Sequence, residues 1–505
     1  MNDIYSLHTF LFPFTWEDDG IDMAVIFKGT DPENIWEAAD TYVQAGNFSR
    51  AVLLEDMEPS EYNAFHYFNE AARDLVFSDR DSGPVQNFRV KDSVLSGTEY
   101  IISKGEGCYS LDIDEILLHI FSTDIAILEL KCNNTRHRSL EAVKAINEYG
   151  RRISMPFWSA NGYSKCADCL ELKGAMLNER DDFRSYKHDK VSFCYVTKIL
   201  RYLLDKNGKG RIFRARRAEN ENEIRISTVV DEKMFVCCLI NDSPFINSLY
   251  DTYEDNGGSF DSQSEASLAE LLYVEPEGSF ESKSIGAVRS RLYGCFYFDE
   301  LAGAHPKLTA VTDQAYIKLI GYPDHDISYF ENVYTKIIIL GLVQRMSVAK
   351  FSAKIKKWTN DIGASGNKIT MRKVNSVMSL QKQFVVFQNQ YVLKEVTVKN
   401  EGRFLYDHIR ERLNIEADYS DISAQISSLY ELVSTVQGST FNKWGLALSL
   451  IAMELSVIGH IDNVDSFLQI DMPSFGGISV IVTEIVIAAI IIWLVTGVIF
   501  NKRGK

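Results

Sequence analysis

Two arginines beside aromatic residues form the first segment whose chemistry suggests a ligand. The sequence reads Asn147-Glu-Tyr-Gly-Arg-Arg152 and continues shortly afterwards with Met155-Pro-Phe-Trp158. Forked guanidinium groups can grip a phosphate through two hydrogen bonds, and an aromatic ring can stack on a base. We therefore predict that Asn147, Arg151, Arg152 and Trp158 contribute to the binding of an anionic ligand.

A second basic segment, from Lys206 to Arg217, lies within an otherwise acidic chain. Three of its arginines, Arg211, Arg214 and Arg216, are candidates for the same ligand. The 505 residues carry a formal net charge of -16. Because nucleic-acid affinity comes mainly from neutralising phosphates, we expect a small anion and no direct nucleic-acid partner. In the structural alternative, both sets of arginines pair with surface acids or complete a helix C-terminus.

A third pattern could hold a metal ion. The run Asp124-Ile-Ala-Ile-Leu-Glu-Leu-Lys131 contains an acid and the Glu129-x-Lys131 pair used by metal-dependent nucleases of the PD-(D/E)xK type. In such sites the acids hold Mg²⁺ and the lysine steadies the attacking water. The same alternation is common in any half-buried strand, and the first acid is close to the pair. Cys166 and Cys169 could form half of a zinc site, but no second pair completes it.

Polar residues also recur in an apolar stretch near the C-terminus. Asn442, Ser449 and Ser456 are spaced seven residues apart and His460 follows one turn later, so they share one helix face. Polar groups inside a bilayer normally face a bundle interior or a water path. We therefore predict that this face lines a pore. Simple helix packing by small and hydroxyl-bearing residues is the alternative.

Two apolar segments predict that this region crosses a membrane twice. Residues 478–500 form a run of 23 with a single acid, enough to span ~30 Å of hydrocarbon. Residues 444–461 form a weaker span, or alternatively a buried core helix. The acidic loop 462–477 lacks Lys and Arg and the tail 501–505 is basic, which places both termini in the cytoplasm. A single span with a large external domain is the other possible topology.

The remaining elements must position these groups. Alternating strand-like and helix-like segments predict an α/β or α+β cytoplasmic ligand-binding domain over residues 1–325, followed by a helical stalk over residues 326–443 with a long helix from residue 372 onward. Strands are expected at residues 6–14, 23–27, 125–130, 193–196 and 235–239. Helices are expected at residues 33–45, 61–75, 110–121, 139–148, 197–204, 265–273 and 328–358.

Residues 401–414, EGRFLYDHIRERLN, lead through the predicted stalk to Phe441-Asn-Lys-Trp444. With this segment, the order of domain, stalk, two spans and basic tail resembles the CorA family of divalent-cation channels. The family's Gly-Met-Asn signature is replaced by Gly459-His-Ile461. The N-terminal Leu7-His-Thr-Phe-Leu-Phe-Pro-Phe14 and the segment 147–152 look like those of divergent CorA-like proteins found beside type III-B CRISPR systems.

The resemblance implies a homopentamer in a bacterial inner membrane that acts in antiviral defence. It also implies gating by a nucleotide second messenger, S-adenosylmethionine-AMP. The first hypothesis is therefore a ligand-gated membrane channel with no enzymatic activity. The second is a CorA-type Mg²⁺ or Co²⁺ transporter, which ion flux independent of any nucleotide would favour. The third is a membrane-tethered enzyme that depends on Glu129 and Lys131.

Overall fold

The computed structural model describes residues 4–16, 21–29, 31–39, 59–77, 83–153, 166–185, 196–214, 222–229, 233–276, 278–280, 286, 288–299, 305–322, 326–364 and 370–434. The chain divides into two units, Met1–Tyr430 and Glu431–Lys505. Only residues 431–434 of the second unit are described. The fold is therefore that of the first unit.

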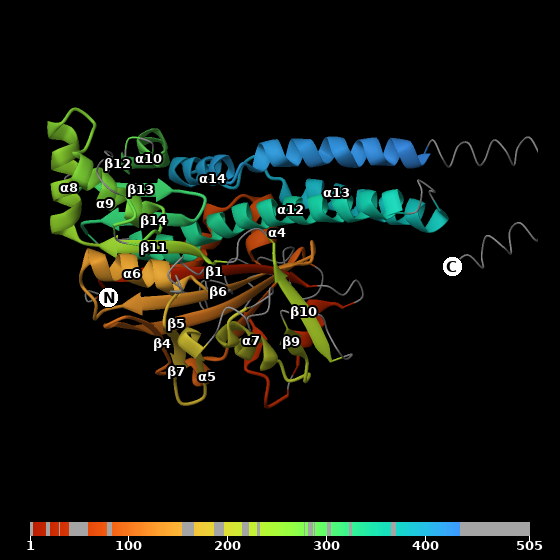
Figure 1. The fold of residues 1–505 in the computed structure, drawn as a ribbon, viewed down its shortest axis with the longest axis horizontal. Helices are drawn as coiled ribbons and strands as arrows, with labels where there is room; N and C mark the ends of the chain where they lie inside the picture. Colours follow the sequence, from red (N-terminus) through yellow and green to blue (C-terminus); the bar gives the residue numbers. More distant parts are fainter. Residues whose placement is uncertain are drawn as a thin grey trace, which may run out of the picture. The chain divides into compact units, whose positions relative to one another are not determined.

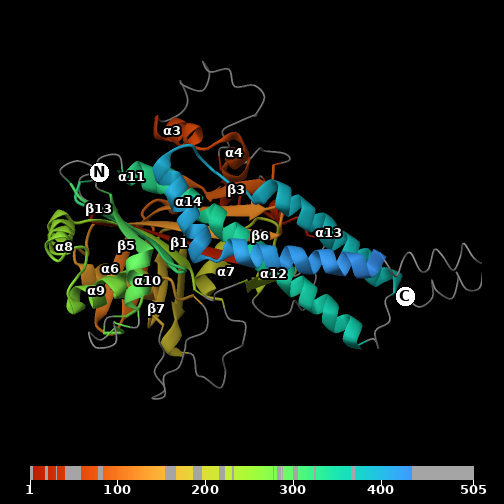
Figure 2. The same ribbon diagram turned by 90° about the horizontal axis from the view of Figure 1, so that it is seen from above.

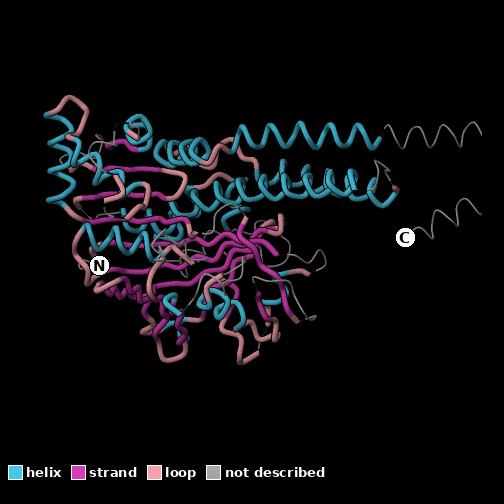
Figure 3. Tube along the Cα trace, in the orientation of Figure 1, coloured by secondary structure: helices cyan, strands magenta, loops and turns pink. Residues whose placement is uncertain are grey.

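A mixed sheet of 14 strands dominates the described residues (Figures 1 and 3). Its strands are β1 (Ser6–Trp16), β2 (Trp36–Ala38), β3 (Val85–Val90), β4 (Glu99–Lys104), β5 (Gly107–Phe121), β6 (Ile125–Asn134), β7 (Cys169–Lys173), β8 (Asn178–Asp182), β9 (Ile212–Arg214), β10 (Glu223–Thr228), β11 (Phe235–Asn241), β12 (Phe296–Asp299), β13 (Lys307–Val311) and β14 (Ala315–Ile320). The main path runs β12-β13-β14-β11-β1-β6-β5-β4-β7-β8, and the other strands attach beside it. Along this path only the β11–β14 pair is parallel.

Helices cover both faces of this sheet. They are α1 (Met23–Phe27), α3 (Pro59–Tyr67), α4 (Glu70–Val76), α5 (Asp92–Leu95), α6 (Leu140–Gly150), α7 (Lys198–Asp205), α8 (Ser243–Asp255), α9 (Ser262–Leu272), α10 (Arg289–Cys295), α11 (Asp326–Tyr329), α12 (Thr335–Ala364), α13 (Met371–Tyr391) and α14 (Asn400–Arg412). A π-helical turn, Phe330–Tyr334, leads into α12, and residues 415–434 are also helical.

Strand β1 lies in the middle of the sheet and is buried on both faces. Successive side chains of a strand point to opposite faces. Phe10, Phe12 and Phe14 accordingly belong to one core, which includes residues of α6 and α7. Leu7 and Leu11 belong to a second core, which includes residues of α3, α4 and α12. A strand that is apolar on both faces is typical of a covered sheet.

Most elements expected from the sequence are confirmed. The confirmed strands are residues 6–14 in β1, 125–130 in β6 and 235–239 in β11. The confirmed helices are residues 61–75 (α3 and α4), 139–148 (α6), 197–204 (α7) and 265–273 (α9). Of the expected strand 193–196, only Val196 belongs to the described residues.

Three expected elements are wrong. Residues 23–27 form helix α1 because the side chain of Asp22 accepts a hydrogen bond from the N–H of Ala24 and caps the helix. Residues 110–121 lie in β5, where a bulge between Ile113 and Glu115 shifts the alternation of apolar side chains. The described part of 33–45 contains strand β2, which pairs with β3.

The described part of the predicted stalk is helical but not continuous. Helix α12 has 30 residues and α13 has 21, and the two pack side by side (Figures 1 and 2). The long helix expected from residue 372 onward is interrupted at residues 392–399, where Val392, Val396, Thr397 and Val398 are β-branched. It is interrupted again at Asn414, whose φ of 53° ends α14 in the left-handed conformation.

The predicted fold class is wrong in its membrane part. No helix among the described residues is long and apolar enough to cross a membrane. Helix α12 has the length, but it carries Lys350, Lys354, Lys356 and Lys357 in its second half, and such charges are costly inside a bilayer. The segments on which the prediction rests, 444–461 and 478–500, lie outside the described residues. In place of a CorA-like architecture with two membrane spans, the structure describes a mixed α/β unit with one large sheet.

Candidate functional site

The first predicted arginine pair lies at the C-terminal end of α6, inside the fold. Arg151 and Arg152 both pair with Glu148, and an Nη of Arg151 donates to the carbonyl oxygen of Val274 at 2.7 Å. Asn147 is buried, and its Oδ1 lies 2.7 Å from the Nδ1 of His8. These side chains join α6 to neighbouring elements. The structural alternative is therefore well supported for this segment.

The second predicted group lies on a different element. Arg211 precedes β9, and the guanidinium of Arg214 lies 3.7 Å from the carboxylate of Asp205 and 3.6 Å from that of Glu223. The structure thus gives the two arginine segments separate acidic partners. Six predicted site residues lie outside the described part of the chain: Trp158, Arg216, Asn442, Ser449, Ser456 and His460.

The nuclease-like residues are only partly brought together. Glu129 and Lys131 point to the same face of β6, where Lys131 lies 2.6 Å from Glu115 and Glu129 lies 2.9 Å from His119. Asp124 is on the turn between β5 and β6 and pairs with a lysine of α12 instead. Within the described ranges, no group of three or more His, Cys, Asp or Glu residues could hold a metal ion.

Glu331 lies on the π-helical turn. It is close enough to the buried group of Glu115, Glu129 and Lys131 for their charges to interact. Burial raises the pKa of Glu331 to about 7. The charge of Lys131 opposes this shift, whereas those of Asp114, Glu115 and Glu129 add to it. Glu331 therefore changes its charge near neutral pH, which is unusual for a carboxyl group.

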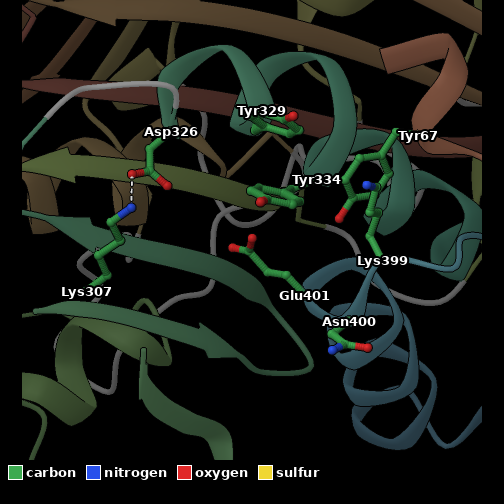
Figure 4. Close-up of a pocket in the computed structure, with 8 residues that line it drawn as sticks. All are labelled: Tyr67, Lys307, Asp326, Tyr329, Tyr334, Lys399, Asn400 and Glu401. Carbon is green, nitrogen blue, oxygen red and sulfur yellow. Dashed lines mark ion pairs between the residues drawn. The ribbon is translucent and has the colours of Figure 1, made fainter. Parts of the chain in front are cut away.

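A cavity of about 410 Å³ opens nearby, where strand β13, the π-helical turn and the start of α14 meet (Figure 4). Three tyrosines line it: Tyr67 at the end of α3, Tyr329 of α11 and Tyr334 of the π-helical turn. The hydroxyl of Thr335 donates to the carbonyl oxygen of Phe330 and satisfies that carbonyl within the π-helical turn. A π-helical turn of this kind often marks a functional site.

The three rings form a compact aromatic group. The ring centroids of Tyr329 and Tyr334 are 6.1 Å apart with an angle of 28° between the planes. Tyr67 meets both rings edge-on, at 5.8 Å and 6.5 Å. Burial and the carboxylate of Glu401 raise the pKa of Tyr334 well above its ordinary value. Its hydroxyl therefore stays protonated and can donate a hydrogen bond.

A buried lysine connects the cavity to the sheet. Lys318 of β14 is 1% exposed, and its Nζ lies 2.9 Å from Asp326 and 2.9 Å from Glu401. The same Nζ lies 4.5 Å from the ring centroid of Tyr334. Lys307 adds a second ion pair to Asp326 at 2.5 Å. Burial alone would raise the pKa of Asp326, but the two lysines hold it below its usual value.

The N-terminus of α14 adds a partial positive charge beside the cavity. Its N-cap residue, Lys399, is exposed and makes no side-chain cap, so the first backbone N–H groups of the helix are not satisfied by a cap. Tyr67 is 8% exposed, and its buried hydroxyl lies at the backbone N–H of Gly402, with no acceptor for its own O–H among the described residues. Gly402 permits this close approach, because a Cβ there would lie 2.6 Å from the Tyr67 hydroxyl.

None of these cavity residues is among the residues predicted from the sequence. One feature of the sequence could have indicated these residues. The strand Ala-Tyr-Ile-Lys-Leu-Ile, β14, contains a single charge, Lys318, at a position that must be buried. A buried lysine needs partners, and its partners Asp326 and Glu401 both line the cavity.

Comparisons with family models and with characterised proteins find no match for this chain. The resemblance to the CorA family therefore stays a prediction. The functional argument depends on the geometry and chemistry of the cavity itself.

Proposed function

We propose that the Met1–Tyr430 unit is a sensor that binds an anionic nucleotide in the cavity and passes the change to helices α12 and α14. The observation that carries this proposal is the cavity of about 410 Å³ in which aromatic rings, lysines and a helix N-terminus converge. Ligand cavities commonly measure about 300–1,000 Å³, so the volume suits a small ligand. The resemblance suggests S-adenosylmethionine-AMP as the ligand and antiviral defence as the setting.

The phosphate of such a ligand has suitable donors at one side of the cavity. Lys307 and Lys399 line it, and the N-terminus of α14 carries a partial positive charge. The O–H of Tyr67 can donate to a phosphate oxygen, which would satisfy a buried donor that otherwise costs free energy. These donors support recognition of an anion.

The heterocyclic part of the ligand has suitable partners at the tyrosines. Tyr329 and Tyr334 both line the cavity, as Figure 4 shows, and Tyr329 is the more exposed of the two rings. Stacking of a base on an aromatic side chain stabilises nucleotide complexes by roughly 1–3 kcal/mol for each base. A metal ion or a plain carboxylate would not use these rings, so the tyrosines favour a nucleotide.

Glu401 gives the cavity a way to couple binding to the helices. Its carboxylate, in the first turn of α14, is paired with Lys318 of the sheet. Glu401 lines the cavity, so a phosphate bound there would repel this carboxylate. A ligand shifts the equilibrium towards whichever arrangement binds it more tightly. Loss of the Glu401 contact would therefore release the start of α14 from β14.

Isothermal titration calorimetry of the full chain with ATP, AMP and S-adenosylmethionine-AMP tests the proposal. A Lys307→Ala/Lys399→Ala variant should weaken nucleotide binding by about tenfold or more, since each charged contact contributes roughly 1.5–3 kcal/mol. Lys173→Ala, on an exposed position of β7, is the matched control. Weakening by Arg211→Ala alone would move the ligand to the predicted arginine segment. Absence of binding by all three nucleotides to the folded protein would refute the proposal.

Glu401→Gln tests the coupling separately. The amide is neutral and does not repel a phosphate in the cavity, so nucleotide affinity should rise several-fold. Hydrogen exchange of α14 amides should also become faster in this variant without ligand, as it does in the native protein with ligand. An unchanged affinity and unchanged exchange would show that Glu401 plays no part in coupling.

A further inference from the structure

A second cavity lies between the β5–β6 turn and helices α12 and α13, and it has a different chemistry. Its volume is about 320 Å³, and it shares no lining residue with the nucleotide cavity. Ser122, Thr123 and Asp124 line it from the turn. The helices contribute mainly lysines, hydroxyls and an amide. Such a lining can donate many hydrogen bonds but has a single carboxylate.

That carboxylate is already neutralised. The Nζ of Lys350 lies 3.1 Å from Oδ2 of Asp124 and donates to the backbone carbonyl oxygen of Asp124 at 3.0 Å. Asp124 adopts a φ of 56°, so the turn is held in a left-handed conformation that presents its backbone to this lysine. Lys350 and Asp124 thus fix the turn against α12. The charge balance of the cavity then depends on its other cations.

Two further lysines give the cavity a positive charge. Lys354 of α12 donates to the side-chain oxygen of Gln383 at 2.9 Å. Lys382 of α13 is exposed and has no ion pair among the described residues. Ser379 lies one turn of α13 before Lys382 and Gln383 and also lines the cavity. Two ammonium groups, a hydroxyl and an amide are the donors that a tetrahedral oxyanion prefers.

The surrounding helices increase this preference. From Lys336 to Lys399 the sequence contains 12 Lys and Arg residues and 2 Asp and Glu residues, although the whole chain carries -16. This segment contains α13 and all of α12 except its first residue. Its positive field raises the local concentration of anions around the cavity. The cavity therefore lies on the most basic part of an otherwise acidic chain, which favours an anion.

We infer that this cavity binds a phosphate monoester, with Lys354 and Lys382 as its charged contacts and Ser379 and Gln383 as its neutral donors. The phosphate bridges α12 and α13 and faces the β5–β6 turn. Binding at this site favours one arrangement of the helix pair against the sheet. It forms a site distinct from the nucleotide cavity, and it does not depend on whether a nucleotide binds there.

The test is calorimetric titration of the full chain with inorganic phosphate and with glycerol 3-phosphate. Lys354→Gln/Lys382→Gln should weaken both by about tenfold or more. The matched control is Lys356→Gln/Lys357→Gln, which removes the same charge from exposed positions of α12 outside the cavity. Thermal melts of both variants should stay close to that of the native protein, because none of the four lysines has an ion pair among the described residues and only Lys354 is half-buried.

A second arm distinguishes a lipid headgroup from a free phosphate. Flotation compares phosphatidylcholine vesicles that contain phosphatidic acid, a monoester, with vesicles that contain phosphatidylglycerol, a diester of lower charge. Preference for phosphatidic acid that is lost in Lys354→Gln/Lys382→Gln identifies a headgroup, and binding of soluble phosphates alone identifies a free ligand. Equal weakening by the two double variants, or no binding of either source, overturns the inference. Nucleotide titration of the same variants keeps this result separate from that of the first cavity.

Discussion

Glu331 offers a direct test of the charge arrangement beneath the π-helical turn. Its pKa is about 7 in the folded protein and 4.5 in a model peptide, so the folded state holds this proton more tightly than the unfolded state. Between these two values the unfolded state has lost the proton while the folded state retains it. Stability from this group is therefore present at low pH and is lost as the pH rises from about 4.5 through about 7.

The size of the effect follows from the same values. One pKa unit corresponds to 1.36 kcal/mol, so ionisation of Glu331 costs the fold about 3 kcal/mol at pH 8. Glu331→Gln keeps the shape of the neutral acid and removes the charge. We expect the variant to match the native protein at pH 4, where both states are protonated, and to be more stable by about 3 kcal/mol at pH 8.

Urea unfolding at a series of pH values measures this difference. Glu254→Gln, on an exposed position of α8, is the control and should leave the pH dependence unchanged. A constant difference between Glu331→Gln and the native protein from pH 5 to pH 8 would refute the reasoning. It would mean that Glu331 is solvated in the folded state or is neutralised by Lys131.

Three further substitutions test the packing described above. Gly402→Ala should destabilise the fold by about 1–3 kcal/mol in urea unfolding, because its Cβ would lie 2.6 Å from the Tyr67 hydroxyl; an unchanged midpoint would contradict the close approach. Glu148→Gln leaves Arg151 buried without its charge partner and should cost roughly 3–5 kcal/mol. Lys318→Met leaves two carboxylates without their shared cation, and its loss of stability should be larger at pH 8 than at pH 4.

The central strands could be predicted from the sequence because their side-chain pattern is regular. Residues 125–130 are apolar apart from Glu129 and follow a short polar turn at residues 122–124, which suits a covered strand. The failure at residues 110–121 has a physical cause. Before the bulge the odd-numbered Leu111 and Ile113 face one core. After the bulge the even-numbered Ile116 and Leu118 face the same core. This phase shift mimics helical spacing.

The cavity could not be predicted because its residues come from distant parts of the chain. Lys318 and Glu401 are 83 residues apart, and no local period connects them. The arginines show the opposite difficulty. Residue type identifies Arg151 as a possible phosphate ligand, but only the fold reveals that Glu148 and a carbonyl oxygen already occupy its donors. The residue type determines the chemistry of a side chain, whereas its hydrogen-bond and ion-pair partners depend on the tertiary structure.

The central position of β1 has a consequence for synthesis of the chain. Strand β1 pairs on one side with β6 and on the other with β11, and the Tyr5 hydroxyl donates to Asp242, 237 residues later. The edge of β1 that pairs with β11 therefore stays unpaired until residue 241 has been synthesised. Exposed strand edges of this kind aggregate readily, and long-range pairing is slow. We expect the nascent chain to require a chaperone that holds β1 until β11 emerges.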